Sequence, residues 1–260
     1  MKTIFEPGIK LAKSFLAAIV FYTTVPLPQK WVLDFGRIAR WSPFIGVIIG
    51  IFLGLIDRGL SQIGLPILTR SVLLVGIWII ITGGLHLDGA IDTADGLASP
   101  NPNRRLEVMK DSVTGAYGAI AAAIILLLKS SALSEIESYR WLGLIYSAGW
   151  ARWGQVVAIA FYPYLRSTGK GKFHKQNFHF PEDFLLGSIF LLTLSGVQIY
   201  WKPDRWLVVI LITISGVVIA IAINWWLNKK LGGHTGDTYG AVVEWTESIL
   251  LCLFAIFFNF

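Results

Sequence analysis

The chain has 260 residues, of which 55% are hydrophobic and only 15% are charged. This composition excludes an ordinary soluble domain of the same length and indicates an integral membrane protein. The net charge of +6 does not require a nucleic-acid partner, because basic residues beside the cytoplasmic ends of membrane spans produce the same excess. We therefore expect one membrane-embedded domain over residues 1–260, with the lipid bilayer around it and no nucleic acid bound.

Eight apolar segments follow one another along the chain, and most approach the roughly 20 residues that a membrane-spanning helix needs. In chain order they are Ala12–Val25, Pro43–Ile56, Ser71–Leu87, Gly115–Leu133, Trp141–Phe161, Phe184–Tyr200, Trp206–Leu227 and Ala241–Phe258. The first is short and ends at two prolines, which favours a re-entrant or interfacial helix. The pattern predicts an all-α, polytopic integral membrane bundle of about seven spans plus a re-entrant N-terminal helix.

Three long polar connections separate these segments, and counting spans places all three on one face of the membrane. They are His86–Thr114, Tyr162–Asp183 and Asn228–Gly240. Together with Pro26–Trp41 they carry twelve basic residues, whereas six basic residues, Lys129 among them, fall on the opposite face. Because basic residues concentrate on the cytoplasmic side, we predict a multi-pass protein of the cell inner membrane whose polar loops are cytoplasmic.

Three aspartates follow the Ser71–Leu87 segment. Asp88, Asp92 and Asp95 have i, i+4, i+7 spacing, which on a helix places them within about 60° of one another. Like charges on one face destabilise a helix unless something neutralises them, and Mg²⁺ in phosphoryl-transfer sites is held by a few carboxylates together with phosphates. Asp111 adds a further carboxylate to the same connection. A Mg²⁺ site is therefore predicted, with a solvated acidic loop as the alternative.

A second group of acids lies near the C-terminus. Asp237, Glu244 and Glu247 fall within about 80° of one another on a helix that we predict to begin near Gly240. Glutamates inside a span are costly and mark functional sites, unless their side chains reach the interface. Two separate acidic clusters would each need neutralising, so we predict one shared cavity, with the last span packed beside the span that ends at Leu87.

Basic and imidazole side chains complete the set. Arg152 lies midway along an apolar segment, where it should pair with a carboxylate or a substrate phosphate. The flexible sequence "RSTGKGKFHK" contains Arg166, Lys170 and Lys172; it suits a diphosphate, although a membrane-surface patch is the alternative and the sequence is not a Walker A loop. His86 is either a ligand or a hydrogen-bonded structural imidazole.

Four stretches in order, "GGLHLDGAIDTADGL", "RLEVMKDSVTGAYGAIA", "YPYLRSTGKGKF" and "LGGHTGDTYGAVVEWTE", resemble the signature blocks of the cobalamin synthase family, the adenosylcobinamide-GDP ribazoletransferases. The early stretch "WSPFIGVIIGIFLG" is similar to a span of that family, so the resemblance covers nearly the whole chain.

The resemblance implies a Mg²⁺-dependent transferase that joins adenosylcobinamide-GDP to α-ribazole or α-ribazole 5′-phosphate and releases GMP. It implies catalytic roles for Asp88, Asp92, Asp95, Asp111 and Glu244, the first four as metal ligands. Substrate binding is expected of His86, Lys110, Arg152, Arg166, Lys170, Lys172, Thr235, Asp237 and Glu247. The proton acceptor and the oligomeric state stay open, a homo-oligomer being one alternative.

Two other function classes remain. A CDP-alcohol phosphotransferase-like phospholipid synthase would use the same metal chemistry, and Asp92-x-x-Asp95-Gly96 is similar to half of its motif, but the second half does not follow. A cation-coupled transporter would also place acids and an arginine in spans. It would in addition predict internal repeats, which this chain does not show.

Overall fold

The computed structural model describes residues 6–258, and this part of the chain is helical with no β-strand, which confirms the all-α prediction. The long helices are α1 (Glu6–Tyr22), α2 (Ser42–Gln62), α3 (Ile67–Thr82), α4 (Leu85–Ala98), α6 (Ala116–Glu135), α7 (Arg140–Phe161), α9 (Glu182–Trp201), α10 (Trp206–Leu231) and α11 (Gly236–Phe258). The short ones are α5 (Arg105–Val108), α8 (Lys170–Gln176), η1 (Ile38–Trp41), η2 (Pro102–Arg104) and η3 (Pro203–Arg205).

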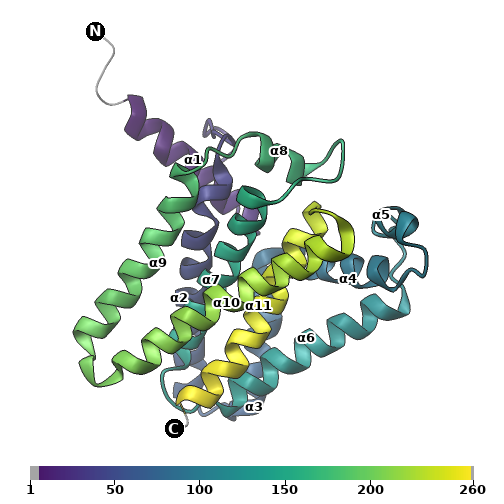
Figure 1. Ribbon diagram of the computed structural model, residues 1–260. Helices are drawn as coiled ribbons and strands as arrows, with labels where there is room; N and C mark the ends of the chain where they lie inside the picture. Colours follow the sequence, from purple (N-terminus) through teal and green to yellow (C-terminus); the bar gives the residue numbers. More distant parts are fainter. Residues whose placement is uncertain (1–5, 259–260) are drawn as a thin grey trace.

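Several helices are long and apolar enough to cross a bilayer, so the protein is a multi-pass membrane bundle. Within the described residues there are five such segments, Ile38–Gln62, Ala116–Glu135, Glu182–Trp201, Pro203–Leu231 and Gly236–Phe257, and the bent pair α3–α4 adds a sixth. The predicted count of about seven spans stays a prediction. Figure 1 shows α1 and α8 at the same end of the bundle, away from the turn between α9 and α10.

Helix α7 forms the centre of the bundle, and every residue from Leu142 to Ile159 is buried. Its tightest neighbour is α2, where Gly46 and Gly50 face it at i, i+4 spacing. A Cβ atom at Gly46 would lie 2.2 Å from the carbonyl oxygen of Ala148, and one at Gly50 would lie 2.5 Å from the Cα of Ile145. The two backbones therefore touch, as small residues allow between membrane helices.

The span that carries the aspartates is broken. Helix α3 ends at Thr82, and α4 leaves it at an angle of 93°. The break lies at Gly83 and Gly84, whose φ values of 62° and 67° are left-handed conformations that glycine adopts without a Cβ penalty. The predicted continuation of this span to Leu87 is therefore wrong, and the aspartates lie on a separate helix that leads from the bundle toward α5 (Figure 1).

Helix α11 begins earlier than predicted, at Gly236 rather than near Gly240. The reason is a reciprocal cap: the backbone N–H of Thr235 donates to Thr238 Oγ1 at 2.8 Å, and the backbone N–H of Thr238 donates to Thr235 Oγ1 at 3.3 Å. Two otherwise unpaired donors at the helix start are thereby satisfied. Asp237 consequently lies in the first turn of α11.

Helices α4 and α11 cross in close contact. The last helix is predicted to pack beside the span that ends at Leu87, but it packs instead against α4, the separate helix that carries the aspartates, because the chain bends between α3 and α4. A Cβ atom at Gly89 would lie 2.6 Å from the carbonyl oxygen of Asp237, and one at Gly240 would lie 2.7 Å from the carbonyl oxygen of His86. Only glycine permits this approach, so these two positions set the separation between the residues on either side of the crossing.

Three of the six basic residues assigned to the opposite face are instead buried in the bundle. Arg70 and Arg140 both contact Asp57, at 2.8 and 2.9 Å, and Lys129 is buried between other helices. Placing Lys129 on that face was therefore wrong: buried ion pairs hold all three, since a charge inside a bundle must be paired.

We predict that Gly89→Ala and Gly240→Ala each destabilise the protein by about 1–3 kcal/mol, because the added methyl group meets backbone atoms that cannot turn aside. Gly76→Ala and Gly196→Ala are the matched controls, since no atom lies within 4 Å of a Cβ at either helical position. The controls should be neutral or stabilising by up to about 1 kcal/mol. Thermal unfolding in detergent measures the difference, and equal stability of all four variants would contradict the prediction.

Candidate active-site cavity

A cavity of about 210 Å³ opens where α4, α11 and the connection between α7 and α9 meet. It is lined by Phe21, Leu85, His86, Asp88, Gly89, Gln155, Tyr164, Arg166, Thr168, Gly169, Lys170, Gly171, His174, Gly236, Asp237, Tyr239 and Gly240. All three predicted polar connections contribute to this wall. The prediction that they share one end of the bundle is therefore confirmed.

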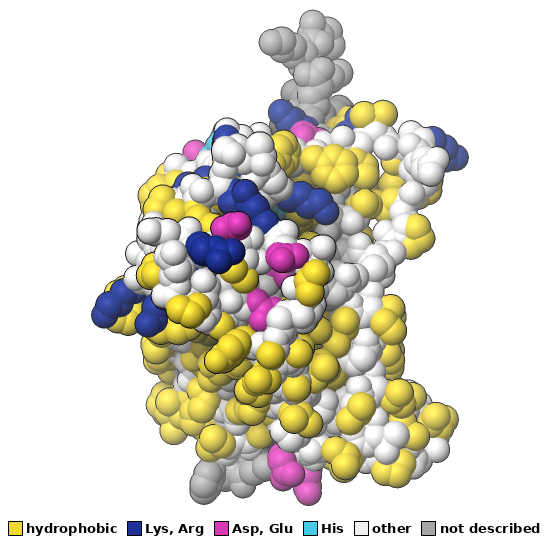
Figure 2. Space-filling model, turned by 90° about the vertical axis from the view of Figure 1, so that its right-hand side faces the viewer, with side chains coloured by type: hydrophobic (Ala, Val, Ile, Leu, Met, Phe, Trp, Pro, Cys, Tyr) yellow, Lys and Arg dark blue, Asp and Glu magenta, His cyan; other side chains and the backbone are white. Residues whose placement is uncertain are grey.

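Five of the predicted site residues line the cavity, namely His86, Asp88, Arg166, Lys170 and Asp237. On the side of the molecule that carries α4, α5 and α6, Figure 2 shows acidic side chains close to basic ones in its upper half and a broad hydrophobic area below. Charged groups that the sequence distributes over three separate connections thus gather at one place.

The acids of the cavity have unequal partners. Asp237 forms an ion pair with Arg166 at 2.5 Å, and Arg166 also donates to the carbonyl oxygen of Met109 at 3.1 Å. The carboxylate of Asp88, by contrast, has no hydrogen bond or ion pair with any described residue. Asp92, one helical turn further along α4, does not line the cavity, and its carboxylate is repelled by both Asp88 and Asp237. We call Asp88, Asp92 and Asp237 the acidic group; Arg166 is its basic neighbour.

Asp95 has a different environment from the acidic group. Its two carboxylate oxygens accept the backbone N–H groups of Gly115 and Gly118, each at 2.7 Å, at the start of α6. A negative charge is favourable there because the N-terminus of a helix carries a partial positive charge. A Cβ atom at Gly118 would lie 2.3 Å from the carboxylate, so glycine is required for this contact. Asp95 joins α4 to α6 and does not line the cavity.

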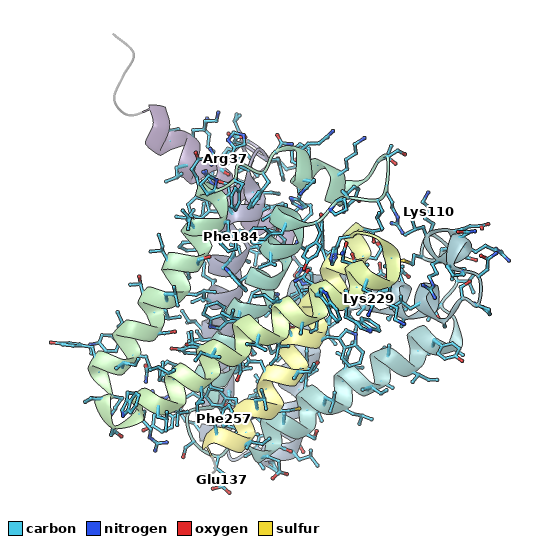
Figure 3. The ribbon with its side chains drawn as sticks, in the orientation of Figure 1. Arg37, Lys110, Glu137, Phe184, Lys229 and Phe257 are labelled. Carbon is cyan, nitrogen blue, oxygen red and sulfur yellow. The ribbon has the colours of Figure 1, made fainter. Side chains whose placement is uncertain are left out.

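Four other predicted site residues lie outside the cavity wall. Asp111 is exposed and accepts the backbone N–H of Val113 at 3.1 Å, and Lys110 is exposed beside α5 (Figure 3). Lys172 donates to the carbonyl oxygen of Ser167. Thr235 is buried in the cap of α11. The metal role of Asp111 and the substrate roles of the other three stay predictions.

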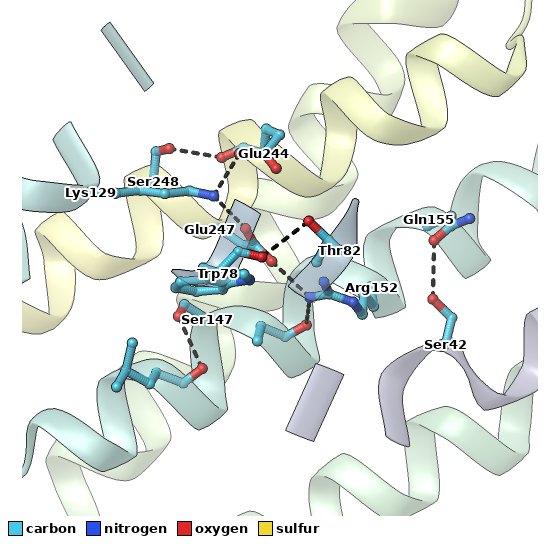
Figure 4. A network of polar contacts seen from close by, with 12 residues as sticks. Ser42, Trp78, Thr82, Lys129, Ser147, Arg152, Gln155, Glu244, Glu247 and Ser248 are labelled. Atoms are coloured by element: carbon cyan, nitrogen blue, oxygen red, sulfur yellow. Dashed lines mark hydrogen bonds and ion pairs between the residues drawn. The ribbon is translucent and has the colours of Figure 1, made fainter. Parts of the chain in front are cut away.

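A buried ion network lies below the cavity. Lys129 Nζ contacts Glu244 at 2.6 Å and Glu247 at 2.5 Å, and Arg152 Nη1 contacts the other oxygen of Glu247 at 2.7 Å (Figure 4). All four side chains are buried, and the Lys129 ammonium lies 4.7 Å from the centre of the Trp78 ring. Two cations and two anions balance, so the network is neutral.

The ion network shows which partner Arg152 has and whether Glu244 and Glu247 reach the membrane interface. Arg152 pairs with a carboxylate, one of its two predicted partners, and neither Glu244 nor Glu247 reaches the interface. Sequence reasoning missed Lys129 as their partner, although a lysine in the middle of an apolar segment is itself a signal of pairing. None of the four lines the cavity, so the prediction of one shared cavity is wrong for Glu244 and Glu247, which Lys129 and Arg152 neutralise separately. The catalytic role given to Glu244 and the substrate roles given to Arg152 and Glu247 stay predictions.

Two members of the ion network are nevertheless near cavity-lining residues in the sequence. Arg152 is three residues before Gln155 on α7, and Glu244 is four residues after Gly240 on α11; both Gln155 and Gly240 line the cavity. Residues three or four apart lie one helical turn apart on the same face. The network therefore fixes α7 and α11 one turn below the cavity floor.

Two buried histidines form part of the cavity wall. His86 and His174 are each 3% exposed, and none of their four ring nitrogens has a hydrogen-bond partner among the described residues. Burial lowers the pKa of His174 to about 4, so its ring is neutral at pH 7. No described residue hydrogen-bonds to the His86 ring, and whether His86 is a ligand or a structural imidazole stays a prediction. The sequence contained His174 within "RSTGKGKFHK" but gave no reason to single it out.

No three His, Cys, Asp and Glu side chains in the described range are arranged to hold a metal ion by themselves. Mg²⁺ in phosphoryl-transfer sites needs only one or two carboxylates when substrate phosphates supply further oxygens. The unpaired carboxylate of Asp88, with Asp92 one turn away, fits that donor set.

We predict that Lys129→Met destabilises the protein by about 3–5 kcal/mol, because it leaves two buried carboxylates with Arg152 as their one cation. The double variant Lys129→Met, Glu244→Gln should recover part of this loss, since Arg152 and Glu247 then remain as a neutral pair. The control Lys110→Met, at an exposed position, should change stability by less than about 0.5 kcal/mol. Thermal unfolding measures all three; a double variant less stable than the single one would contradict the charge-balance argument.

Comparison with known proteins shows the family. The model of the cobalamin-5-phosphate synthase family matches residues 14–255. The chain is 55% identical over 246 residues to the adenosylcobinamide-GDP ribazoletransferase of Trichormus variabilis, which covers 95% of this chain and 98% of that protein. It is 48% identical over 240 residues to the protein of the same name from Synechocystis sp., with 90% and 91% covered. No solved structure matches.

The matched region includes every segment that lines the cavity, from the end of α1 to the start of α11. Identity near one half over almost the full length of both chains leaves no large part of the protein outside the comparison. The chain belongs to the cobalamin-5-phosphate synthase family.

Proposed function

We propose that this protein is an adenosylcobinamide-GDP ribazoletransferase. It joins adenosylcobinamide-GDP to α-ribazole or α-ribazole 5′-phosphate, which gives adenosylcobalamin or its 5′-phosphate and releases GMP. The observation that carries the proposal is the cavity at the crossing of α4 and α11, whose wall holds Asp88 and Asp237 together with Arg166 and Lys170. The relatives named for this activity support it, since they match nearly the full chain.

The reaction exchanges one phosphorus–oxygen bond for another. The ribose 3′-hydroxyl oxygen of α-ribazole attacks the phosphorus that is linked to cobinamide, and the bond from that phosphorus to the oxygen of the GMP phosphate breaks. The hydroxyl proton passes to a carboxylate. Arg166 and Lys170 stabilise the negative charge that develops on the leaving phosphate, because fixed cations near developing charge lower the barrier.

We assign the acids of the cavity as follows. Asp88 and Asp92 would hold Mg²⁺, since Asp88 is unpaired and Asp92 lies one turn away on the same helix. When bound, Mg²⁺ neutralises the diphosphate and polarises it for attack. Asp237 is the remaining carboxylate and would accept the hydroxyl proton at its Oδ once Arg166 turns to the phosphate. Asp95 holds α6 against α4 and so positions this group.

We also propose that the cavity opens to the cytoplasm in the inner membrane. The nucleotide substrates are soluble there, and the three polar connections around the cavity, together with Pro26–Trp41, carry twelve of the 22 lysine and arginine residues. The same loops contain Arg166 and Lys170, so one orientation satisfies both the positive-inside rule and access for the substrates.

The two other function classes lack comparable support. A phospholipid synthase of the CDP-alcohol type would share the metal chemistry but belongs to a different family from the one matched over residues 14–255. A transporter would use Lys129, Arg152 and the glutamates as a coupling site, whereas these groups form a closed, charge-balanced network.

We expect Asp88→Asn to lower the rate of GMP release from adenosylcobinamide-GDP and α-ribazole by roughly 10²-fold or more, the usual cost of removing a group that stabilises transition-state charge. The same variant should bind Mn²⁺ more weakly, which electron paramagnetic resonance measures without turnover. Asp204→Asn is the control, since Asp204 is exposed at the turn before α10. Wild-type turnover and metal affinity in Asp88→Asn would contradict the assignment.

Cysteine labelling tests the orientation. In a Cys252→Ser background, single cysteines at Asn103, Thr168 and Lys229 lie at exposed positions in the three polar connections. A membrane-impermeant maleimide should label them in inverted membrane vesicles and leave them unlabelled in intact spheroplasts, because these loops face the cytoplasm. A cysteine at Asp204, on the turn between α9 and α10, should show the reverse pattern. Labelling of the three loops from outside would overturn the orientation.

A further inference from the structure

The cavity has two chemically different ends. Arg166 and Asp237 are partly exposed at its mouth, with side chains 17% and 19% accessible. The deeper wall carries His86, His174 and Tyr239, which are 3%, 3% and 2% exposed. The mouth is thus charged and wet, while the inner end is aromatic, neutral and enclosed. One substrate part would be bound at each end.

The inner wall presents polar atoms that the protein itself does not use. The ring nitrogens of His86 and His174 and the hydroxyl of Tyr239 have no hydrogen-bond partner in the described part of the chain. Buried polar atoms in native proteins are almost always paired, so a group of five such atoms around one cavity points to a ligand. Each neutral imidazole offers one donor and one acceptor, and the tyrosine hydroxyl offers both.

The rings in and behind this wall favour a flat ligand. The ring of Tyr22 lies nearly parallel to those of His86 and His174, with interplanar angles of 25° and 10° and centroids 6.3 and 6.0 Å away. The Phe21 ring meets His174 edge-on, with centroids 4.6 Å apart. Planar heterocycles stack on aromatic side chains whatever their identity, because every base has a π-face. Such an array suits a planar ring with polar atoms at its edge.

The size of the cavity limits what enters it. Sites that enclose a whole drug-sized ligand usually measure about 300–1,000 Å³. At about 210 Å³, this cavity is smaller than that range, and a nucleotide linked to a macrocycle is much larger. A single heterocyclic base with part of its ribose is the portion that the inner end can enclose, while phosphates remain at the mouth.

We infer that the inner end of the cavity binds the planar nitrogen heterocycle of a nucleoside substrate, with His86, His174 and Tyr239 as its hydrogen-bond partners. The ribose of that nucleoside then lies beside Asp88 and Asp237, and the phosphates face Arg166. This inference rests on the proposed function, and it assigns a recognition role to His174 and Tyr239. Two substrates carry such a ring, the benzimidazole of α-ribazole and the guanine of the GDP group.

Binding without turnover tests the inference. His174→Phe keeps an aromatic ring and removes both nitrogens, and Tyr239→Phe removes only the hydroxyl. The full-length protein in lipid nanodiscs is titrated separately with α-ribazole, with GMP and with inorganic diphosphate by calorimetry. We expect each variant to weaken binding of one of the two nucleoside probes by at least 5–10-fold and to leave diphosphate binding within twofold of wild type. The probe that weakens identifies which base occupies the inner end.

The control is His179→Phe, an exposed histidine outside the cavity, which should bind all three probes like wild type. Unchanged nucleoside binding in both variants, or an equal loss for diphosphate, would overturn the inference. If His174→Phe fails to fold, Tyr239→Phe carries the test, since it alters one atom. A wild-type protein that releases no GMP would refute the proposed function, whereas the binding differences between variants would still decide the base site.

Discussion

Where α4 crosses α11, Gly89 lies against the backbone of Asp237 and Gly240 lies against that of His86. A side chain at either glycine would push the helices apart, and with them Asp88 and Asp237, which line the same cavity. Two local features produce the crossing. The bend at Gly83 and Gly84 turns α4 away from the axis of α3, and the cap formed by Thr235 and Thr238 starts α11 at Gly236. The position of every group in the cavity depends on this contact.

Charged side chains inside the bundle are of two kinds. Some are paired with an opposite charge and stabilise the fold, and others are left unbalanced at the cavity, where they are available for chemistry. Asp57 is matched by Arg70 and Arg140, and Glu244 and Glu247 are matched by Lys129 and Arg152. Such pairs are required wherever a charge is taken out of water, because an unpaired ion there is very costly. The acidic group differs, since its three carboxylates outnumber Arg166 and Lys170, the two cations of the cavity wall, and Asp237 alone of the three forms an ion pair. An excess of negative charge at the mouth of a cavity needs a further cation, whereas the network of Lys129, Arg152, Glu244 and Glu247 is neutral by itself.

The cavity combines this charged mouth with a neutral aromatic interior, and the two suit successive parts of one nucleotide. A base at the inner end would fix the ribose between the acids, and the ribose would in turn place its hydroxyl near the phosphates. Holding reacting groups in this way supplies much of a transferase's rate, because little covalent chemistry is left for the side chains. The buried network one turn below keeps α7 and α11 from moving apart when charged substrates enter.

The sequence by itself determined the helical membrane class, the three polar connections at one end and the candidates Asp88, Asp237, Arg166 and Lys170, because hydrophobic length and charge spacing are local properties of the chain. The sequence also allowed the family to be predicted, since the signature blocks are continuous stretches of the chain. It did not reveal that Asp95 would turn to the start of α6, that Lys129 would pair with two glutamates, or that His174 would join His86 in one wall.

Those outcomes depend on contacts between residues far apart in the chain, and only the packing of the helices decides them. Asp95 lies seven residues after Asp88, on the same face of α4, which suits a shared site. Its carboxylate instead accepts two backbone N–H groups at the start of α6. A buried lysine such as Lys129 must pair with a carboxylate, but the sequence does not show which helix supplies that carboxylate. Tertiary structure decides these cases because each depends on which groups reach one another across the bundle, and spacing along one helix contains no information about that distance.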